Sequence, residues 1–275
     1  RRGVSRADLP RGLKDRSYIR PRPGWYAAAG ADPLAVEAVT RGGAISCLSA
    51  LGYHDIWIPP RPSKLHIRGN SQAHRDHPGR YCTQFGRPRA VRSAIDDPLT
   101  ALRHALRCLD PESITVVCDS LLNTSRRAIS GQPVAEILTP TEIASAFDGA
   151  PRRTPACLHR CDDRAASGTE TMVRLRLRSK NVKVEVQARI PGLGHVDLLV
   201  GDRLIVEVDS LSHHTGIERY REDRRRDQVA ARLGMLHMRL TYENVVYEWP
   251  QTEATILSAV RAGHHRAPRH RRPAV

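Results

Sequence analysis

Three short segments between residues 182 and 209 constrain the fold of this chain more than any other feature, because apolar and polar side chains alternate in each. Valines alternate with charged or amide side chains over residues 182–188, and the same period of two returns in residues 195–200 and 203–209. The side chains of a strand point alternately to its two faces, so the pattern predicts strands that bury one face. The Gly-Asp dipeptide between the last two segments predicts a tight turn, and therefore a hairpin.

Helical patterns flank these strands. A helix is expected over residues 168–178 and a charged helix over residues 217–233, which Gly234 ends at a C-cap position. Another alternating strand follows at residues 235–240, and a last helix at residues 252–260. The sequence therefore predicts the order α-β-β-β-α-β-α and an α/β (α+β) fold class.

Acidic side chains gather on one face of the predicted hairpin. Glu207 and Asp209 share the polar face of their strand, and Asp197 lies on the polar face of the preceding strand. Like charges at ~4 Å repel by about 4 kcal/mol at an effective dielectric constant near 20, so such a cluster is unfavourable without a cation. Carboxylate oxygens suit Mg²⁺ or Mn²⁺. The pattern favours a divalent-metal site, and solvated charges at the end of a strand are the alternative.

Residues suited to phosphodiester hydrolysis surround these acids in the sequence. His213 and His214 follow the acidic strand, where they could move protons or bind a metal or phosphate. The next helix contains Arg226, between aspartates at positions 223 and 227, and the strand after it contains Arg239. A metal ion lowers the pKa of a bound water, and arginine holds a flanking phosphate. The combination is typical of phosphodiester hydrolysis.

Some of these residues also have a purely structural explanation. Glu170 completes a Ser167-x-x-Glu170 capping box, and helix capping explains its identity as well as a role in the site does. Asp223, Arg226 and Asp227 have the spacing of ion pairs within one helix. Both interpretations stay open at this stage.

The charge of the chain points to a polyanionic partner. Its 275 residues contain 44 Lys and Arg against 29 Asp and Glu, a net charge of +15. Double-stranded DNA fits this excess best, since an aromatic content of 4% leaves few platforms for stacking single strands. No apolar run approaches the ~20 residues of a membrane span, and none follows the basic N-terminus as in a signal peptide. A cytoplasmic protein without membrane contacts is expected.

The six cysteines indicate reduced thiols rather than a disulfide framework. The segment Cys157-Leu-His-Arg-Cys161 offers three zinc ligands, whereas zinc takes four, and its spacing is not that of a usual zinc knuckle. Chance explains this segment better than metal binding does.

The remainder of the chain is less regular. Residues 1–60 contain two short helical patterns around a basic, proline-rich hairpin with Arg20 and Arg22, the outline of a winged-helix DNA-binding module. Residues 61–155 predict a small α/β extension and linker, and residues 263–275 a basic, disordered tail. Three further elements are expected in the extension: helices over residues 97–109 and 134–147, and a buried strand or helix start at residues 114–118.

The C-terminal motifs, taken together and in order, resemble a known family. They are Ser167-Gly-Thr-Glu170, Gly194-His-Val-Asp197, Leu204-Ile-Val-Glu207-Val-Asp209, His213-His214, Asp223-Arg-Arg-Arg226-Asp227 and Leu236-His-Met-Arg239. This set resembles the bacterial domain related to very-short-patch-repair endonucleases, of the restriction-endonuclease-like PD-(D/E)XK superfamily, over residues 165–262. The resemblance implies an α-β-β-β-α-β core around a central mixed sheet.

The N-terminal part is similar to the winged-helix domain of abortive-infection antitoxins of the AbiEi type. The likeness rests on Leu13, Arg20, Gly24-Trp25-Tyr26 and residues 45–50. It implies a DNA-binding module, with Arg20 and Arg22 as candidate contacts to DNA.

The resemblance to the endonuclease-related domain assigns a role to each matching position. It implies that Asp197 and Glu207 are the ligands of Mg²⁺ or Mn²⁺, with the carbonyl of Val208 as a third. Glu170 would orient a water or a second ion. Apart from the resemblance, the chemistry of Arg226 and Arg239 makes them candidate contacts to the nucleic acid.

One departure from the superfamily pattern concerns the catalytic lysine. Asp209 stands where the superfamily has a lysine, two residues after Glu207. The very-short-patch branch also lacks that lysine and uses histidines, so His213 or His214 would be the acid, the base or a phosphate contact, and His214 is expected to substitute for the lysine.

A metal-dependent DNA endonuclease or nickase with an N-terminal DNA-binding module is therefore the leading expectation. The alternative is a DNA-binding regulator of antitoxin type whose nuclease-like domain has lost catalysis. The sequence leaves open whether the protein acts as a monomer or as a homodimer.

Overall fold

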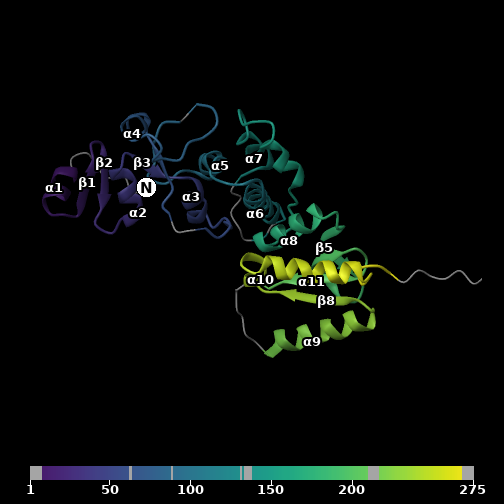
Figure 1. Ribbon diagram of the computed structural model, residues 1–275. Helices are drawn as coiled ribbons and strands as arrows, with labels where there is room; N and C mark the ends of the chain where they lie inside the picture. Colours follow the sequence, from purple (N-terminus) through teal and green to yellow (C-terminus); the bar gives the residue numbers. More distant parts are fainter. Residues whose placement is uncertain are drawn as a thin grey trace, which may run out of the picture. The chain divides into compact units, whose positions relative to one another are not determined.

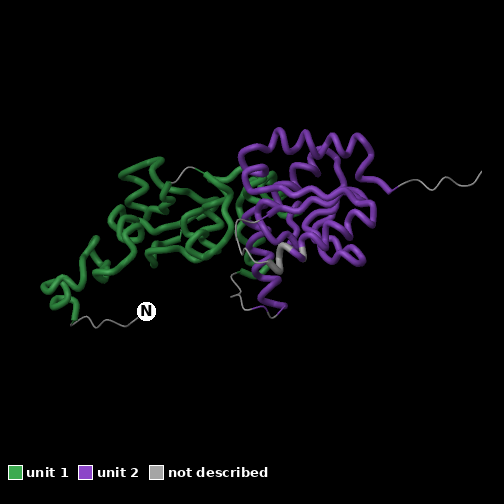
Figure 2. The backbone as a smooth tube through the Cα atoms, turned by 90° about the horizontal axis from the view of Figure 1, so that it is seen from below, with its two compact units in different colours: residues 1–114, 136–159 green, residues 115–135, 160–275 purple. Residues whose placement is uncertain are grey.

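The computed structural model describes residues 8–61, 64–87, 89–130, 132, 138–209 and 217–267. The backbone divides into two compact units (Figure 2), residues 1–114 with 136–159 and residues 115–135 with 160–275. The chain passes from the first unit to the second, returns, and leaves again, so neither unit is one continuous segment. The predicted C-terminal domain lies within the second unit, together with residues 115–135 of the stretch interpreted as an extension.

The first unit begins with a helix and a hairpin, as the sequence indicates. Its first elements are α1 (Asp8–Lys14), β1 (Tyr18–Arg22), β2 (Trp25–Ala28) and α2 (Pro33–Thr40), and β1 and β2 are antiparallel. Asp32 begins α2, because its carboxylate accepts hydrogen bonds from the backbone of Leu34 and Ala35 at 2.8 and 3.0 Å. The second of the two helical patterns expected in residues 1–60 therefore begins at Pro33.

A second pair of strands organises the remainder of this unit. The elements are β3 (Gly43–Ile45), α3 (Cys47–Tyr53), β4 (Ile67–Gly69), α4 (Ser71–Asp76), α5 (Pro98–Ala105), α7 (Pro140–Ser145) and the 3-10 helix η1 (Pro155–Arg160). β3 and β4 are antiparallel. A Cβ at Gly43 would lie 2.3 Å from the carbonyl oxygen of Arg68, so the close approach of the two strands requires glycine. The Arg68 guanidinium is buried and pairs with Asp96 at 2.5 Å.

The segment around residues 114–118 is helical, which decides between the two alternatives left by the sequence. It belongs to α6 (Pro111–Ile129), which begins in the first unit and continues into the second. Asp110 accepts a hydrogen bond from the backbone of Ser113 at 2.9 Å and so caps the first turn. The apolar run therefore lies in a stretch of helix that is buried on all sides rather than in a strand.

The second unit contains the predicted order of elements. They are α8 (Gly168–Ser179), β5 (Val184–Ile190), β6 (Gly194–Val200), β7 (Leu204–Val208), α9 (Ile217–Arg232), β8 (Leu236–Leu240), α10 (Tyr242–Val246) and α11 (Trp249–Arg261). The strands form one sheet in the order β5-β6-β7-β8. The first three are antiparallel neighbours, and β8 lies parallel to β7. The expected α/β class and the mixed central sheet are confirmed; α10 is an additional short helix.

Helices cover both faces of this sheet, with α9 on one side and α11 on the other (Figure 1). Ile205 is fully buried and packs in one cluster with Ala230 of α9. Leu204, Val206 and Val208 are buried on the opposite face of the same strand. Residues 205 and 207 therefore point towards the side that α9 covers.

A buried ion pair fixes α8 to α6. The guanidinium of Arg174 lies 2.6 Å from the carboxylate of Asp119, and both side chains are buried. The same carboxylate accepts hydrogen bonds from the hydroxyl of Thr171 and from the backbone of Asp162, each at 2.8 Å. This pair sets the position of the helix that carries Glu170. None of the described helices combines the length and the apolar character that a membrane crossing requires.

Candidate functional site

Glu170 lies in the first turn of α8 and is 4% exposed. The backbone N–H of Glu170 donates to Oγ of Ser167 at 3.1 Å, and that hydroxyl donates to Oε1 of Glu170 at 3.0 Å. The backbone of Ala166, rather than that of Ser167, donates to Oε2 at 2.9 Å, so the capping is a variant of the expected box. The side-chain amide of Gln187 also donates to Oε2, at 3.2 Å. Glu170 therefore caps its helix and also faces the sheet.

Asp197 lies on β6 and connects Glu170 to the next strand. The amide of Gln187 donates to its Oδ1 at 3.2 Å, and the backbone N–H of Val208 donates to its Oδ2 at 2.9 Å. Gln187 thus bridges the two carboxylates. The register pairs Leu198 with Val206, so the next residues along these antiparallel strands, 197 and 207, are neighbours on the same face. The structure thus sets Asp197 and Glu207 side by side, as the alternation indicates.

Glu207 is surrounded by cationic groups. Its Oε1 accepts a hydrogen bond from the guanidinium of Arg226 at 2.5 Å, and its Oε2 lies 3.0 Å from Nε2 of His237. Nε of Arg239, the residue paired with Glu207 in the parallel register, lies 3.8 Å from Oε2. The other ring nitrogen of His237 lies 3.0 Å from Asp227. The negative charge of Glu207 is therefore balanced from α9 and β8.

The backbone at Gln187 has a left-handed conformation, with φ 50°. This conformation is unfavourable for a residue with a side chain, by about 1–2 kcal/mol, and is retained where the surrounding structure enforces it. The carbonyl oxygen of Gln187 lies 3.1 Å from Nδ1 of His195. The strain coincides with the side chain that joins Glu170 to Asp197, as is common at functional sites.

The three carboxyl groups differ strongly in acidity. Burial, and then the neighbouring charge of Asp197, raise the pKa of Glu170 to about 7. Burial also raises the pKa of Asp197, and the charge of Glu207 adds to this effect. Burial acts in the same direction on Glu207, yet hydrogen bonds from His237 and Arg226 lower its pKa to about 2. The site thus contains one firmly ionised carboxylate and two that resist ionisation.

The ligand atoms of the three carboxyl groups do not all lie within 4.8 Å of one another, so a divalent cation would have to draw them closer. Glu170, Asp197 and Glu207 present carboxylate oxygens from one helix and two adjacent strands, the ligand type that Mg²⁺ and Mn²⁺ prefer. A cation would favour the ionised forms of Glu170 and Asp197, which the protein alone disfavours. The oxygens of Glu207 already have partners in Arg226 and His237, so a metal would compete with these groups for them.

The other predicted site residues have varied surroundings. Asp209 directly follows β7 and is exposed, and its backbone N–H donates to the carbonyl of Leu240 at 2.8 Å. Val208 contributes its backbone N–H to Asp197, and metal binding by its carbonyl stays a prediction. His213 and His214 lie outside the described residues.

The arginines predicted to bind DNA have partners within the protein. Arg226 also donates to the carbonyls of Leu193 and His195, each at 2.9 Å, so it pairs across elements rather than along α9. Arg239 lies 3.3 Å from Asp223 of α9. Contacts of these arginines to DNA stay predictions.

The arginines of the N-terminal hairpin stack on aromatic rings. The guanidinium of Arg20 lies 5.9 Å from the ring centre of Tyr26, and that of Arg22 lies 5.6 Å from the ring centre of Trp25. These cation–π contacts hold the two guanidinium groups against aromatic rings of the same hairpin. A contact of this hairpin with DNA stays a prediction.

Sequence reasoning missed two residues of the site. Gln187 was placed on the polar face of its strand, but nothing indicated that its amide joins two carboxylates. His237 lies two residues before Arg239 on β8, so the two side chains share one face of the strand. This spacing could have identified His237 as a residue of the site.

Neither the protein-family models, nor the curated proteins, nor the solved structures contain a match to this chain. The resemblance to the endonuclease-related domain and to the antitoxin module therefore stays a prediction, and the functional argument rests on the site itself.

Proposed function

We propose that this protein is a metal-dependent DNA endonuclease or nickase related to the very-short-patch-repair endonucleases, with its active site at Glu170, Asp197 and Glu207. The observation that carries the proposal is the chain of contacts in which the amide of Gln187 joins Glu170 to Asp197, which lies beside Glu207 on the adjacent strand. The α-β-β-β-α-β order of the second unit supports it, because the family it resembles places its acids on the same elements.

In this proposal each residue has a distinct task. Asp197 and Glu207 would hold Mg²⁺ or Mn²⁺, and the ion would supply a water of lowered pKa and positive charge beside the phosphoryl group. Gln187 holds Asp197 in place, and Glu170 accepts a proton from the attacking water in its ionised form, which the cation would favour. The histidines at 213 and 214 protonate the leaving oxygen. The net charge of +15 attracts the DNA.

A nicking assay on supercoiled plasmid tests the proposal. The protein is incubated with Mg²⁺ or Mn²⁺ next to the variants Asp197→Asn and Glu170→Gln, which keep side-chain volume but remove charge. Glu185→Gln is the matched control, because Glu185 is an exposed carboxylate on β5. Nicking is expected from the native protein and the control, and it should disappear with chelator and in both site variants.

Equal nicking by all four proteins would show that the activity does not come from these carboxylates. Binding of Mn²⁺ gives a second readout that needs no substrate. The native protein and Glu185→Gln should bind the ion with the same affinity, and Asp197→Asn should lose it. Mn²⁺ binding that is unchanged in Asp197→Asn would contradict the assignment of the metal ligands.

The second candidate is a DNA-binding regulator of antitoxin type without catalysis. It is favoured by the surroundings of Glu207, whose charge is already balanced by Arg226 and His237 without a metal. For this function, DNA affinity should be the same with chelator, with Mn²⁺ and in Asp197→Asn, and no nicking should occur. Both candidates require an affinity for DNA that falls steeply with salt, since bound cations are released from phosphates.

A further inference from the structure

Four side chains of the first unit that can ligate a metal lie close together in space, although they are far apart in the sequence. Cys47, His66, Cys82 and Cys108 each present a sulfur or ring nitrogen, and these four atoms lie within 4.8 Å of one another. Nδ1 of His66 lies 3.3 Å from Sγ of Cys82, and Sγ of Cys108 lies 3.9 Å from that of Cys82. Cys47 is buried and the other three are partly buried.

Hydrogen bonds of the backbone hold three of these residues in place around the β3–β4 pair. The backbone of Ser46, next to Cys47, donates to the carbonyl of His66 at 2.9 Å. His66 in turn donates its backbone N–H to the hydroxyl of Ser49 at 2.9 Å. The backbone of Cys82 donates to the carbonyl of Ile67 at 2.8 Å. The positions of these ligands are therefore a product of the fold of this unit.

The fourth residue is held from another direction. Cys108 follows α5, and its carbonyl accepts a hydrogen bond from the guanidinium of Arg61 at 3.1 Å. Arg61 is itself paired with Asp110 at 2.7 Å. Supporting contacts of this kind orient metal ligands in known sites.

Cys47 has a backbone conformation that a residue with a side chain rarely adopts. Its φ is 52°, in the left-handed region, at the first residue of α3. Such strain persists when the surrounding structure enforces it, and it is concentrated at functional positions. At Cys47 the conformation accompanies a thiol that lies beside the other three ligand atoms.

The spacing of the four atoms fits a single tetrahedral ion. With zinc–sulfur bonds of ~2.3 Å and a zinc–nitrogen bond of ~2.0 Å, a tetrahedron places two sulfurs about 3.8 Å apart and a sulfur and a nitrogen about 3.5 Å apart. The separations of 3.9 and 3.3 Å are close to these values. A disulfide would need a sulfur–sulfur distance of ~2.05 Å, and it would use only two of the three thiols and not the imidazole. A multi-iron cluster would distribute its ligands over several ions.

We propose that Cys47, His66, Cys82 and Cys108 bind one Zn²⁺ in a closed Cys₃His site that stabilises the fold of the first unit. Three cysteines and one histidine fill all four positions, so the site has a structural rather than a catalytic role. Zinc joins the start of α3, the approach to β4, the segment after β4 and the turn after α5. Because such a site does not exist in the unfolded chain, its binding energy contributes to folding.

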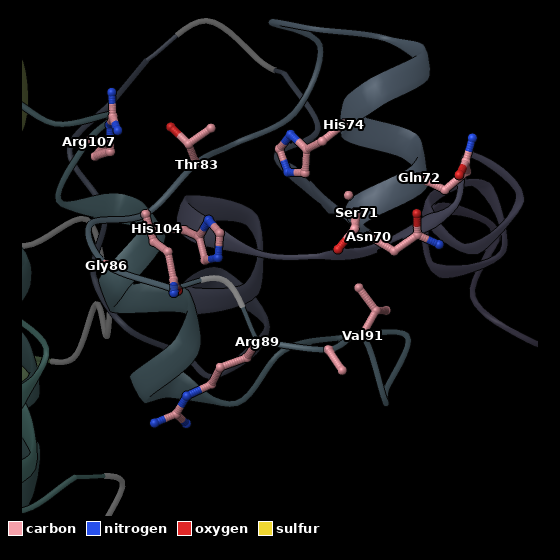
Figure 3. A pocket seen from close by; sticks show the side chains of 13 residues that line it. Asn70, Ser71, Gln72, His74, Thr83, Gly86, Arg89, Val91, His104 and Arg107 are labelled. Carbon is pink, nitrogen blue, oxygen red and sulfur yellow. The ribbon is translucent and has the colours of Figure 1, made fainter.

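The site also supports the wall of a cavity in the same unit. Thr83 and Arg107, next in sequence to Cys82 and Cys108, line a cavity of about 830 Å³ together with the buried His104 (Figure 3). Loss of the ion would free two of the segments that form this wall. The cavity is therefore expected to depend on the zinc.

Metal analysis of the full-length protein tests the proposal directly. Protein purified without chelator should contain one equivalent of zinc, and the cobalt-substituted protein should show the strong visible absorption of a tetrahedral thiolate site. Cys82→Ser and Cys108→Ser should each lose the metal. Cys161→Ser is the matched control, since Cys161 is also partly buried but lies in the second unit. It should keep the full equivalent.

Two further measurements keep the proposal testable if the cysteine variants fail to fold. Chelator added to the native protein should release zinc, make three additional thiols reactive and lower the melting temperature. His66→Cys should keep zinc in a Cys₄ site, with a shifted cobalt spectrum. A folded native protein that neither contains nor takes up zinc, iron in place of zinc, or full zinc content in the Cys82→Ser/Cys108→Ser double variant would overturn the proposal.

Discussion

The buried pair of Arg174 and Asp119 leads to a quantitative prediction about the helix that carries Glu170. The two side chains are 0% and 2% exposed and approach to 2.6 Å. Burial raises the pKa of Asp119 even though Arg174 lies beside it, so the cost of removing this carboxylate from water exceeds the attraction between the charges. Removing one partner of the pair and replacing both partners by apolar residues should therefore change the free energy of unfolding by very different amounts.

The single variant Asp119→Ala leaves a buried guanidinium without its counter-charge, and should lower the free energy of unfolding of the second unit by about 3–5 kcal/mol. The double variant Asp119→Leu/Arg174→Met replaces both charges by apolar side chains. It should recover most of this loss, since a well-packed apolar pair is often as stable as a buried ion pair. Thr171→Val removes one hydrogen bond to the carboxylate, and should cost only about 1–2 kcal/mol.

Urea unfolding measures these differences if the signal comes from the second unit alone. Of the three tryptophans, only Trp249 belongs to that unit, so a background of Trp25→Phe and Trp57→Phe makes its fluorescence specific. The midpoint should fall in the single variant while the dependence on urea stays unchanged. A double variant as unstable as Asp119→Ala would refute the reasoning, because the loss would then come from packing and not from an uncompensated charge.

Three further predictions concern the site and the turn beside it. Because the pKa of Glu207 is lowered, its contribution to the free energy of unfolding is complete above pH 4.5 and is lost as the pH falls through about 2. In Glu207→Gln the urea midpoint should therefore decline less over this pH range than in the native protein. Glu170 has a raised pKa, so the free energy of unfolding should decline as the pH rises from 4.5 through about 7, and Glu170→Gln should make this decline smaller in the same titration, while the raised pKa of Asp197 contributes the remainder. Gly201→Ala should lower the melting temperature, because φ is 62° and the new Cβ would lie 2.3 Å from the carbonyl oxygen of His265; a melting temperature equal to that of the native protein would contradict the observed turn.

Sequence periodicity was sufficient to predict the face of the sheet on which the acids lie. The alternation in residues 203–209 placed Glu207 opposite the apolar face of its strand, and the expected hairpin brings Asp197 beside it through a turn of three residues, 201–203. The period of two is a local signal, but the register that sets Asp197 beside Glu207 comes from the observed three-residue turn, since a two-residue turn would have paired Asp197 with Val206. The Ser167-x-x-Glu170 signal was local in the same sense.

The charge balance of the site was decided only by the tertiary structure. Arg226 has the spacing of an intrahelical partner for the aspartates of α9, yet its guanidinium pairs with Glu207. His237 reaches Glu207 because β8 lies parallel to β7 after a helical crossover. Neither contact follows from periodicity, since both depend on how a helix is placed over the sheet.

The cysteine cluster is the clearest case of this difference. The sequence drew attention to Cys157 and Cys161, which are close along the chain, whereas Cys47 and Cys108 meet only after the first unit has folded. Short-range spacing reports which residues one helix or strand brings together. Contacts between distant segments depend on strand pairing and on the packing of helices, and for this protein those contacts determine which side chains share a metal site.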